Sequence, residues 1–369
     1  MAKSGGTKKK AYWEEYSNLQ RVKHDLIQDY LGGWFPKITK WNGRVVYIDT
    51  HAGRGTHLKG ELGSPLVALD TLLNHRALEM VTSGGEVVFT FIEHNAENLA
   101  ALESELKAKE PLPKGVKVYP HEGDSFELID SWVSELEAEN KSLAPSFVFC
   151  DPFGFSVPGE LLHRLMKFNR VELFVNIIWR ELDMAMAQGR NGTIKDGMRQ
   201  TLDLIFNGHD WLNEIDGETS DERADQCANL FREIVGARWG TFIRMVDNGR
   251  TRYFLLHLTN HEAGRDLMKN CIWSACPDGG YYARKSDDPK QQHLIMPEPD
   301  MGPIEDWVRF QLVQGPRRWK ELHELVREEV WLEKHVNEIV RGLRKDGSIV
   351  AEDYEGRFSA SANPRLRLV

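Results

Sequence analysis

Cysteine is scarce in this sequence, and long apolar runs are absent. Four cysteines are scattered over 369 residues without a CxxC pair: Cys150, Cys227, Cys271 and Cys276. This spacing argues against a disulfide framework or a zinc site, and it fits a reducing, cytoplasmic environment. There is no run of about 18 apolar residues, so no transmembrane helix is expected. Residues 1–11 are basic but lack the apolar segment of a secretory signal, and we expect them to form a disordered tail.

Two nucleotide-binding signatures and an excess of positive charge are also missing. The sequence contains no GxxxxGK[ST] phosphate loop, and Gly53 and Gly55 lack the third glycine of the dinucleotide-binding pattern GxGxxG. The formal net charge of −9 argues against general coating of nucleic acid, but it leaves room for a local basic patch. Histidines near the strand ends have no ligand spacing, so no metal site is predicted.

Short apolar runs alternate with amphipathic helical segments in the first two-thirds of the chain. Buried strands are predicted in the runs RVVYID, EVVFTFIE, VKVYP, SFVFC and VELFVNII. A helix from Trp13 to Leu31 is expected to end at Gly32-Gly33, and a helix over 64–80 is expected to begin with Ser64 as its N-cap. This alternation predicts an open α/β fold, with a mostly parallel sheet covered by helices.

The remainder of the chain shows an insertion, a hairpin and a separate tail. Residues 179–236 are polar with a helical pattern and are predicted to form a helical insertion. Two strand-like runs then flank Asn248-Gly249, a strong hairpin signal. Such a terminal antiparallel pair is typical of a Rossmann-like methyltransferase domain, here placed at 12–295. After a proline-containing linker at 296–303, three short helices and a β-ribbon over 304–369 predict a winged helix-turn-helix domain.

A glycine loop follows the first strand, at the edge of the sheet where open α/β folds bind ligands. In the segment DTHAGRG, Gly53 and Gly55 let the backbone come close to a ligand, and Asp49 can receive an ammonium group or orient the loop amides. His51 lies within the loop and is included among the cofactor-binding candidates. Taken alone, the pattern is equally compatible with a tight turn between a strand and a helix.

Acidic residues after the second and third strands extend this candidate site. Glu93 is placed to accept the two hydroxyls of a ribose, or to act as an acid at a helix N-terminus. Asp124 and Ser125 can contact an adenine, while Asp124 can equally cap the helix that follows, and the two roles are compatible. Together with the glycine loop, these residues suit a nucleoside-like methyl donor, S-adenosylmethionine, better than a dinucleotide.

The segment Asp151-Pro152-Phe153-Gly154-Phe155 follows the fourth strand and resembles the DPPY tetrad of amino-directed methyltransferases. Asp151 and Pro152 would orient the target nitrogen, and Phe153 or Phe155 would stack on a planar base. The segment departs from the tetrad because Phe153 occupies the place of the second proline. An Asp-Pro pair at a strand end is also compatible with a simple turn.

These segments, together with GSPLVAL, ELFVNI and YFLLHLTNHEAGRDLMKNCIW, resemble the three-Cys-motif partner protein family. The resemblance covers most of residues 20–285 and implies a methyltransferase-like fold with Asp49, Gly53, Gly55 and Glu93 on the cofactor. The family is named for a neighbouring radical-type protein that carries the three-cysteine motif, so the resemblance also implies such a partner. The four cysteines of this chain are not clustered. The family's loop has an aromatic residue where His51 stands, and the resemblance gives no substrate.

The first hypothesis for function is a methyltransferase that acts on a nitrogen of a nucleic-acid base. The alternative is a non-catalytic cofactor- or nucleic-acid-binding partner of a radical-type enzyme, and a third hypothesis is a winged-helix regulator with a degenerate enzyme domain. Basic residues of the tail are the candidate nucleic-acid contacts: Lys334, Arg341, Arg344, Lys345 and Arg357. An apolar face of the same tail helix is predicted to be buried: Leu332, Val336, Ile339, Val340 and Leu343. Because acids nearly balance bases in the tail, docking of a protein there remains equally open.

Overall fold

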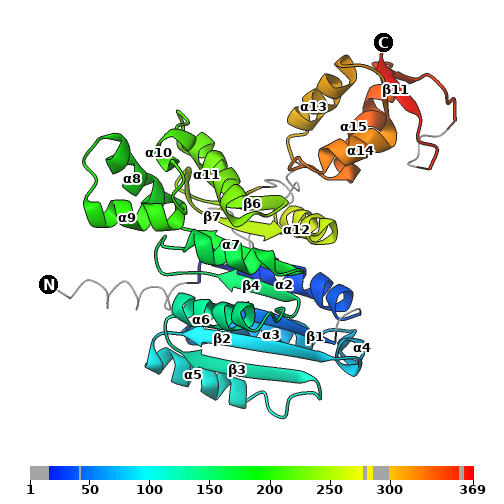
Figure 1. Cartoon of the computed structure of the whole chain (residues 1–369). Helices are drawn as coiled ribbons and strands as arrows, with labels where there is room; N and C mark the ends of the chain where they lie inside the picture. Colours follow the sequence, from blue (N-terminus) through cyan, green and yellow to red (C-terminus); the bar gives the residue numbers. More distant parts are fainter. Residues whose placement is uncertain (1–15, 41–42, 277–280, 286–298, 357–360) are drawn as a thin grey trace. The chain divides into compact units, whose positions relative to one another are not determined.

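The computed structural model describes residues 16–40, 43–276, 281–285, 299–356 and 361–369. The chain divides into two compact units, Met1–Cys271 with Tyr282–Gln292 and Ile272–Tyr281 with His293–Val369 (Figure 1). The predicted tail at 1–11 and residues 296–298 of the predicted linker lie outside the described residues. Within the described ranges, no helix combines the length and the apolar character needed to cross a bilayer.

A mostly parallel sheet forms the centre of the first unit. Its strands are β1 (Arg44–Asp49), β2 (Glu86–Glu93), β3 (Val116–Glu122), β4 (Ser146–Cys150), β5 (Val171–Ile177), β6 (Trp239–Asp247), β7 (Arg250–Thr259) and β8 (Tyr282–Arg284). They lie in the order β3-β2-β1-β4-β5-β7-β6-β8, with β1 to β5 parallel and β7 antiparallel to β5 and β6. The chain order of the strands reverses between β1 and β4, the kind of switch point at which open α/β sheets bind ligands. The predicted open sheet and its terminal antiparallel pair are therefore confirmed.

Burial explains the continuous apolar sequence of the central strands. Every residue of β4 and β5 is buried, as expected for strands of a parallel sheet that is covered on both faces. The β6–β7 hairpin turns at Asn248 and Gly249, whose φ angles of +52° and +71° give the left-handed conformation of a type I′ turn. The turn predicted from the Asn-Gly pair is confirmed. The sequence does not predict β8, because three residues carry no usable periodicity.

Several helices surround this sheet. They are α2 (Asn18–Ile38), α3 (Ser64–Leu73), α4 (Leu78–Ser83), α5 (Ala96–Lys107), α6 (Ser125–Ala138), α7 (Gly159–Lys167) and α12 (Glu262–Ala275). The stretch 64–80 therefore contains α3 and the start of α4 rather than one helix. Gly63 occupies the N-cap position of α3, so the prediction of Ser64 as the N-cap is wrong by one residue.

Helix α2 continues through Gly32-Gly33, so the predicted end at these glycines is wrong. A Cβ on Gly33 would lie 2.6 Å from Leu267 Cδ1 of α12, and the glycine therefore lets the two helices approach closely. Pro36 has no backbone N–H to donate to Gly32 O one turn earlier, and His75 Nε2 donates to this oxygen instead at 3.0 Å. Close packing and a side-chain donor keep the helix intact where the sequence alone favours a break.

The second half of α2 is fixed to β5 by a fully buried polar cluster. Tyr30 Oη and Trp34 Nε1 donate to the two oxygens of Glu172, the latter at 3.0 Å. His257 Nε2 of β7 lies 3.0 Å from Glu172 Oε2. Burial acts to raise the pKa of the Glu172 carboxyl, but the hydrogen bonds from His257, Tyr30 and Trp34 hold it below its usual value. The cluster therefore keeps a charged carboxylate inside the protein with its acceptors satisfied.

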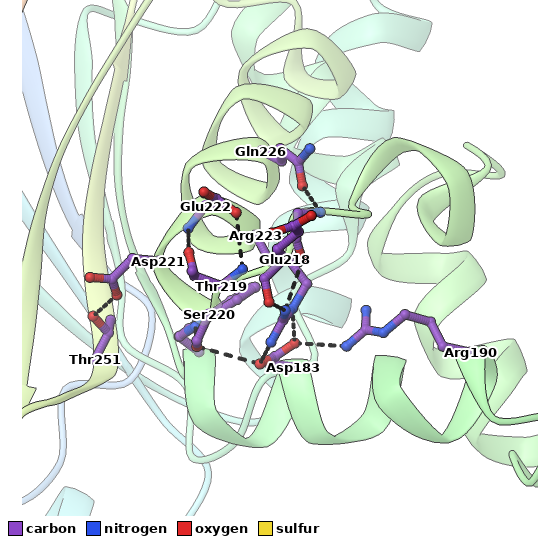
Figure 2. A network of polar contacts seen from close by, with 12 residues as sticks. Asp183, Arg190, Glu218, Thr219, Ser220, Asp221, Glu222, Arg223, Gln226 and Thr251 are labelled. Carbon is purple, nitrogen blue, oxygen red and sulfur yellow. Dashed lines mark hydrogen bonds and ion pairs between the residues drawn. The ribbon is translucent and has the colours of Figure 1, made fainter.

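The predicted insertion at 179–236 contains the helices α8 (Trp179–Arg190), α9 (Asp196–Ile205), α10 (Trp211–Glu214) and α11 (Ser220–Val235). Figure 2 shows Asp183 of α8 between Arg190 and Arg223, with contacts of 3.0 Å to Arg190 and 2.8 Å to Arg223. Burial acts to raise the pKa of Asp183, but hydrogen bonds from the two arginines hold it below its usual value. At the start of α11, Asp221 accepts a 3.0 Å hydrogen bond from Thr251 of β7. The insertion is thus joined internally and to the sheet.

The second unit is small and has its own core. Its elements are α13 (Gly302–Val313), β9 (Arg317–Arg318), α14 (Trp319–Val326), α15 (Glu333–Lys345), β10 (Ile349–Ala351) and β11 (Arg365–Leu368), and the strands form an antiparallel sheet in the order β10-β11-β9. The apolar face predicted for the third tail helix is buried, as expected: Leu332, Val336, Ile339, Val340 and Leu343. The predicted helices and ribbon are present, and β9 adds a strand that the sequence does not predict.

Candidate functional site

A cavity of about 520 Å³ lies at the carboxyl ends of β1, β4 and β5 in the first unit. Open α/β sheets bind ligands at this edge, and the volume falls within the range of roughly 300–1,000 Å³ that is typical of ligand sites. Five of the predicted site residues line the cavity: His51, Gly53, Asp151, Pro152 and Phe153. The structure thus brings the glycine loop and the Asp-Pro-Phe segment together around one space. The other candidates in this unit lie outside its lining: Asp49, Gly55, Glu93, Asp124, Ser125 and Phe155.

The side chain of Glu93 holds the glycine loop through a hydrogen bond from the loop backbone. Gly53 and Gly55 have φ angles of +66° and +85°, which glycine adopts without strain. The amide of Gly53 donates to Glu93 Oε2 at 2.9 Å, and the amide of Asn95, the N-cap of α5, donates to Glu93 Oε1 at 2.7 Å. Glu93 therefore acts on the backbone at the start of α5. Each carboxylate oxygen retains a second acceptor site, so the predicted ribose contact stays a prediction.

Asp49 is a buried acid at the end of β1. Its side chain is fully inaccessible, and Oδ1 accepts a hydrogen bond from the amide of His51 at 3.2 Å. Burial raises the pKa of Asp49 to about 7, against the opposing effects of Ser64 and of the His51 amide. Oδ2 is buried, and no hydrogen bond to it forms within the described part of the chain. Asp49 is thus a buried carboxyl with spare acceptor capacity, directly behind the loop residues His51 and Gly53 that line the cavity.

His51 connects the loop after β1 to the loop after β3. Its Nε2 lies 3.3 Å from Ser125 Oγ, and its ring meets the Phe126 ring edge-on at 5.4 Å between centroids. Burial lowers the pKa of His51 to about 4, so the imidazole is neutral near pH 7. Asp124 Oδ1 accepts hydrogen bonds of 3.0 and 3.1 Å from two amides in the first turn of α6. The capping role of Asp124 is confirmed, and its predicted contact with adenine stays a prediction.

Asp151 forms a buried ion pair with Lys23 of α2, a residue that lies outside every sequence motif. The Asp151 side chain is 15% exposed and the Lys23 side chain 4% exposed. Asn176 Nδ2 of β5 also donates to Asp151 Oδ1, at 2.5 Å. Burial acts to raise the pKa of Asp151, but the Lys23 charge and the hydrogen bonds from Lys23 and Asn176 hold it below its usual value. Asp151 is therefore ionised, and an internal cation compensates its charge.

The two candidate stacking rings lie in different surroundings. Phe153 lines the cavity and is 60% exposed. Phe155 is partly buried and packs against the hydrophobic core, away from the cavity lining. Gly154 between them has a φ angle of +118°, a conformation that L side chains rarely adopt, and it turns the chain between the two rings. Of these two rings, only that of Phe153 belongs to the cavity lining.

Helix α2 contributes site residues that the sequence reasoning missed. Lys23 and His24 line the cavity from this helix, and His57 lines it from the glycine loop. Tyr16 Oη lies 2.9 Å from His24 Nδ1, and burial, aided by the Lys23 charge, lowers the pKa of His24 to about 3. The sequence does offer one signal for Lys23, because this lysine lies one helical turn after Leu19, on the apolar face of the helix. A lysine on a buried face almost always has a charge partner, so a nearby acid could have been expected. Among the described residues, no group of His, Cys, Asp and Glu side chains is arranged to hold a metal ion.

The basic candidates of the second unit divide into two groups. Lys334, Arg341 and Lys345 are exposed along one face of α15, which Glu338 shares. Arg344 instead donates to the carbonyl oxygens of Gly356 and Glu355, at 2.8 and 3.2 Å, and so holds the segment that precedes β11. Arg357 lies outside the described residues.

Comparison with known proteins finds only distant structural similarity. No protein-family model matches the chain, and no curated protein matches its sequence. An O-methyltransferase from Bacillus cereus in complex with SAH is 15% identical, with 67% of this chain and 83% of that chain covered and a TM-score of 0.32. The O-methyltransferase TomG from Streptomyces achromogenes, in complex with SAM, is 14% identical, with 67% and 92% covered and a TM-score of 0.33. Similarity at this level assigns neither an activity nor a ligand to this chain. Membership of the three-Cys-motif partner family stays a prediction.

Proposed function

We propose that the first unit binds S-adenosylmethionine and transfers its methyl group to a nitrogen of a nucleic-acid base. The observation that carries the proposal is the shared cavity, which joins the glycine loop after β1 to the Asp151–Phe153 segment after β4. The position of the cavity supports the proposal, because it lies at the carboxyl ends of β1, β4 and β5, the edge at which open α/β sheets bind ligands.

The cofactor side of the proposal rests on the buried carboxyl and the glycines. Asp49 would receive the ammonium group, Gly53 and Gly55 would let the backbone approach the ligand, and Glu93 would accept the ribose hydroxyls. Asp124 and Ser125, next to His51, would face the adenine. When bound, S-adenosylmethionine supplies a methyl group on a cationic sulfur. The neutral His51 imidazole leaves this cation without a repelling charge.

The acceptor side rests on Asp151, Pro152 and Phe153. Asp151 is ionised, and its oxygens retain acceptor sites beyond those that Lys23 and Asn176 use. An acceptor N–H group could be oriented by such a site and by the Pro152 carbonyl, while the exposed Phe153 ring stacks on the base. Lys23 keeps Asp151 charged during binding, because it holds the pKa of this carboxyl low.

In this proposal the second unit is a winged helix-turn-helix domain that binds the nucleic acid. The order of its helices and strands supports this assignment, and α15 presents Lys334, Arg341 and Lys345 on an exposed face. Contacts of this kind weaken steeply as salt rises. The full chain, titrated with RNA and DNA duplexes at two salt concentrations, should bind more tightly at the lower one. The double charge reversal K334E/R341E should remove this binding, and K141E in the first unit should retain it. Salt-insensitive or absent binding would favour a protein-docking role for this unit.

One observation favours the alternative, a non-catalytic cofactor-binding partner of a radical-type enzyme. Lys23 already compensates the charge of Asp151, the residue expected to orient the target amine. In that case the cavity would hold the ligand, and transfer would not follow.

Calorimetric titration with S-adenosylmethionine, followed by tritium transfer to RNA, DNA and protein pools, distinguishes these functions. Binding with transfer supports the enzyme, and binding without transfer supports the partner. Absence of binding contradicts both and favours the third hypothesis of a degenerate domain. The D151N variant should abolish transfer while it keeps cofactor affinity within about threefold, because its contacts lie on the acceptor side.

A further inference from the structure

Two cations lie on the lining of the candidate cavity and have no role in the scheme above. Arg252 belongs to β7, and Lys285 directly follows β8. Their side chains are 56% and 39% exposed, whereas the Lys23 side chain inside the cavity is 4% exposed. Both are therefore accessible to a ligand from solvent. A pair of accessible cations is a marked feature in a chain whose formal net charge is −9.

The local backbone explains how these side chains come to face the cavity. Met245 pairs with Tyr253 and Val246 with Thr251, so Arg252 is the extra residue of a β-bulge. Bulges redirect a side chain that regular pairing would place elsewhere. Lys285 is held beside the same part of β6, because its amide donates to the carbonyl oxygen of Val246 in that strand at 2.9 Å. One short stretch of β6 thus positions both cations.

The charges nearby leave this pair with capacity for an anion. Asp247 is the carboxylate shared by both cations, 3.2 Å from Arg252 and 4.0 Å from Lys285. Glu181 of α8 also lines the cavity and is exposed. A guanidinium has five donors and an ammonium has three, so one shared carboxylate leaves most of them available to a phosphate.

We propose that the acceptor carries a phosphate beside its planar ring, and that Arg252 and Lys285 bind this phosphate while Phe153 stacks on the ring. This inference rests on the proposed function and names its substrate class as a nucleotide rather than a nucleoside or another planar amine. The aromatic ring and the cations line one cavity, as a base and its phosphate require. The nucleotide would then be selected within the first unit alone.

The experiment measures the affinity of the full chain for the four nucleosides and their 5′-monophosphates, with and without saturating S-adenosylhomocysteine. At least one monophosphate should bind 10- to 100-fold more tightly than its nucleoside, as expected for charge-assisted hydrogen bonds. R252Q and K285Q should each remove most of this difference. E181Q should increase it, because it removes the opposing acid. K141Q is the matched control, since Lys141 is a 65% exposed lysine outside this cavity, and it should leave the difference unchanged.

Each outcome bears on one proposal. Equal affinity for nucleotide and nucleoside, absence of binding by both, or a preference that R252Q and K285Q leave intact overturns this inference. Failure to bind S-adenosylhomocysteine contradicts the proposed function, and the phosphate preference is still measured without it. A dinucleotide distinguishes the source of the phosphate: tighter binding than the monophosphate assigns the acceptor to a polymer, and weaker binding assigns it to a free nucleotide.

Discussion

Replacement of Lys23 by methionine tests the ion pair that holds α2 against the site. The side chains of Lys23 and Asp151 are 4% and 15% exposed, so the variant leaves a carboxylate in a buried position without its charge partner. Removal of one partner from a buried pair costs roughly 3–5 kcal/mol. The 2.5 Å hydrogen bond from Asn176 to Asp151 remains, and we therefore expect the lower end of this range, about 3 kcal/mol at pH 8.

The pH dependence of the K23M variant has a definite sign. In the wild-type protein the pKa of Asp151 lies below 3.8, so the pair contributes stability above pH 3.8 that is lost as the pH falls through the lowered native pKa. Without Lys23, burial dominates and raises the pKa of Asp151. The K23M deficit should therefore be smallest in acid and should grow as the pH rises through the new pKa.

Urea unfolding at pH 5 and pH 8 measures both effects. The double variant K23M/D151N should recover at least half of the loss of K23M at pH 8, because the amide removes the unpaired charge. Lys37 lies exposed on the same helix, and K37M should leave stability unchanged. A K23M variant within about 1 kcal/mol of the wild type at pH 8, or a double variant no more stable than K23M, would refute this account of the pair. D151A is unsuitable for activity assays, because it leaves Lys23 buried beside an apolar methyl group.

Three further predictions concern other parts of the first unit. The pKa of Asp49 is raised to about 7, so its ionisation removes stability as the pH rises from 3.8 through 7. The D49N variant should therefore match or exceed the thermal stability of the wild type at pH 8, and it should bind S-adenosylmethionine at least about 10-fold more weakly by calorimetry. A lower stability of D49N at pH 8 would contradict the proposed charge state. The G33L variant should lose about 1–3 kcal/mol of its free energy of unfolding in urea, because the new side chain overlaps Leu267. The G32A variant should lose less, because the atom nearest to its new Cβ is 4.0 Å away. Equal losses would exclude close helix packing as the reason for Gly33. The D183A variant should lose roughly 2 kcal/mol of its free energy of unfolding, and its melting temperature should fall by about 4–8 °C, because two arginines lose their shared acceptor. A fall in melting temperature of less than about 1 °C would show that the insertion does not depend on this contact.

The sheet could be predicted from the sequence because its central strands, β4 and β5 above all, are buried on both faces. Such strands are continuous apolar runs, and an acidic residue or a glycine loop at the end of each run marks the ligand edge. The sequence therefore predicts correctly that Asp49 and Asp151 lie at the carboxyl ends of their strands. Their protonation was not predictable in this way, since the pKa of Asp49 depends on burial and that of Asp151 on Lys23.

The rest of the site depends on contacts between distant parts of the chain. Lys23 and Asp151 lie 128 positions apart, and no local pattern indicates that they pair. The true length of α2 was missed for the same reason. Gly33 and Pro36 normally interrupt a helix, and only Leu267 and His75, which pack on α2 from elsewhere, account for its continuation.

Helix α2 connects the candidate cavity to the amino-terminal end of β5. Its 21 residues extend over about 30 Å. Lys23 and His24, near one end, form part of the cavity wall, and Tyr30 and Trp34, further along, are hydrogen-bonded to Glu172, the second residue of β5. The helix is thus attached to the rest of the first unit at two places, by the Lys23–Asp151 ion pair and by the hydrogen bonds to Glu172. Tyr30 and Trp34 do not line the cavity, yet they help to fix the helix that carries Lys23 and His24. We therefore expect loss of the Trp34 hydrogen bond to alter ligand binding in the cavity without removing any residue of its lining.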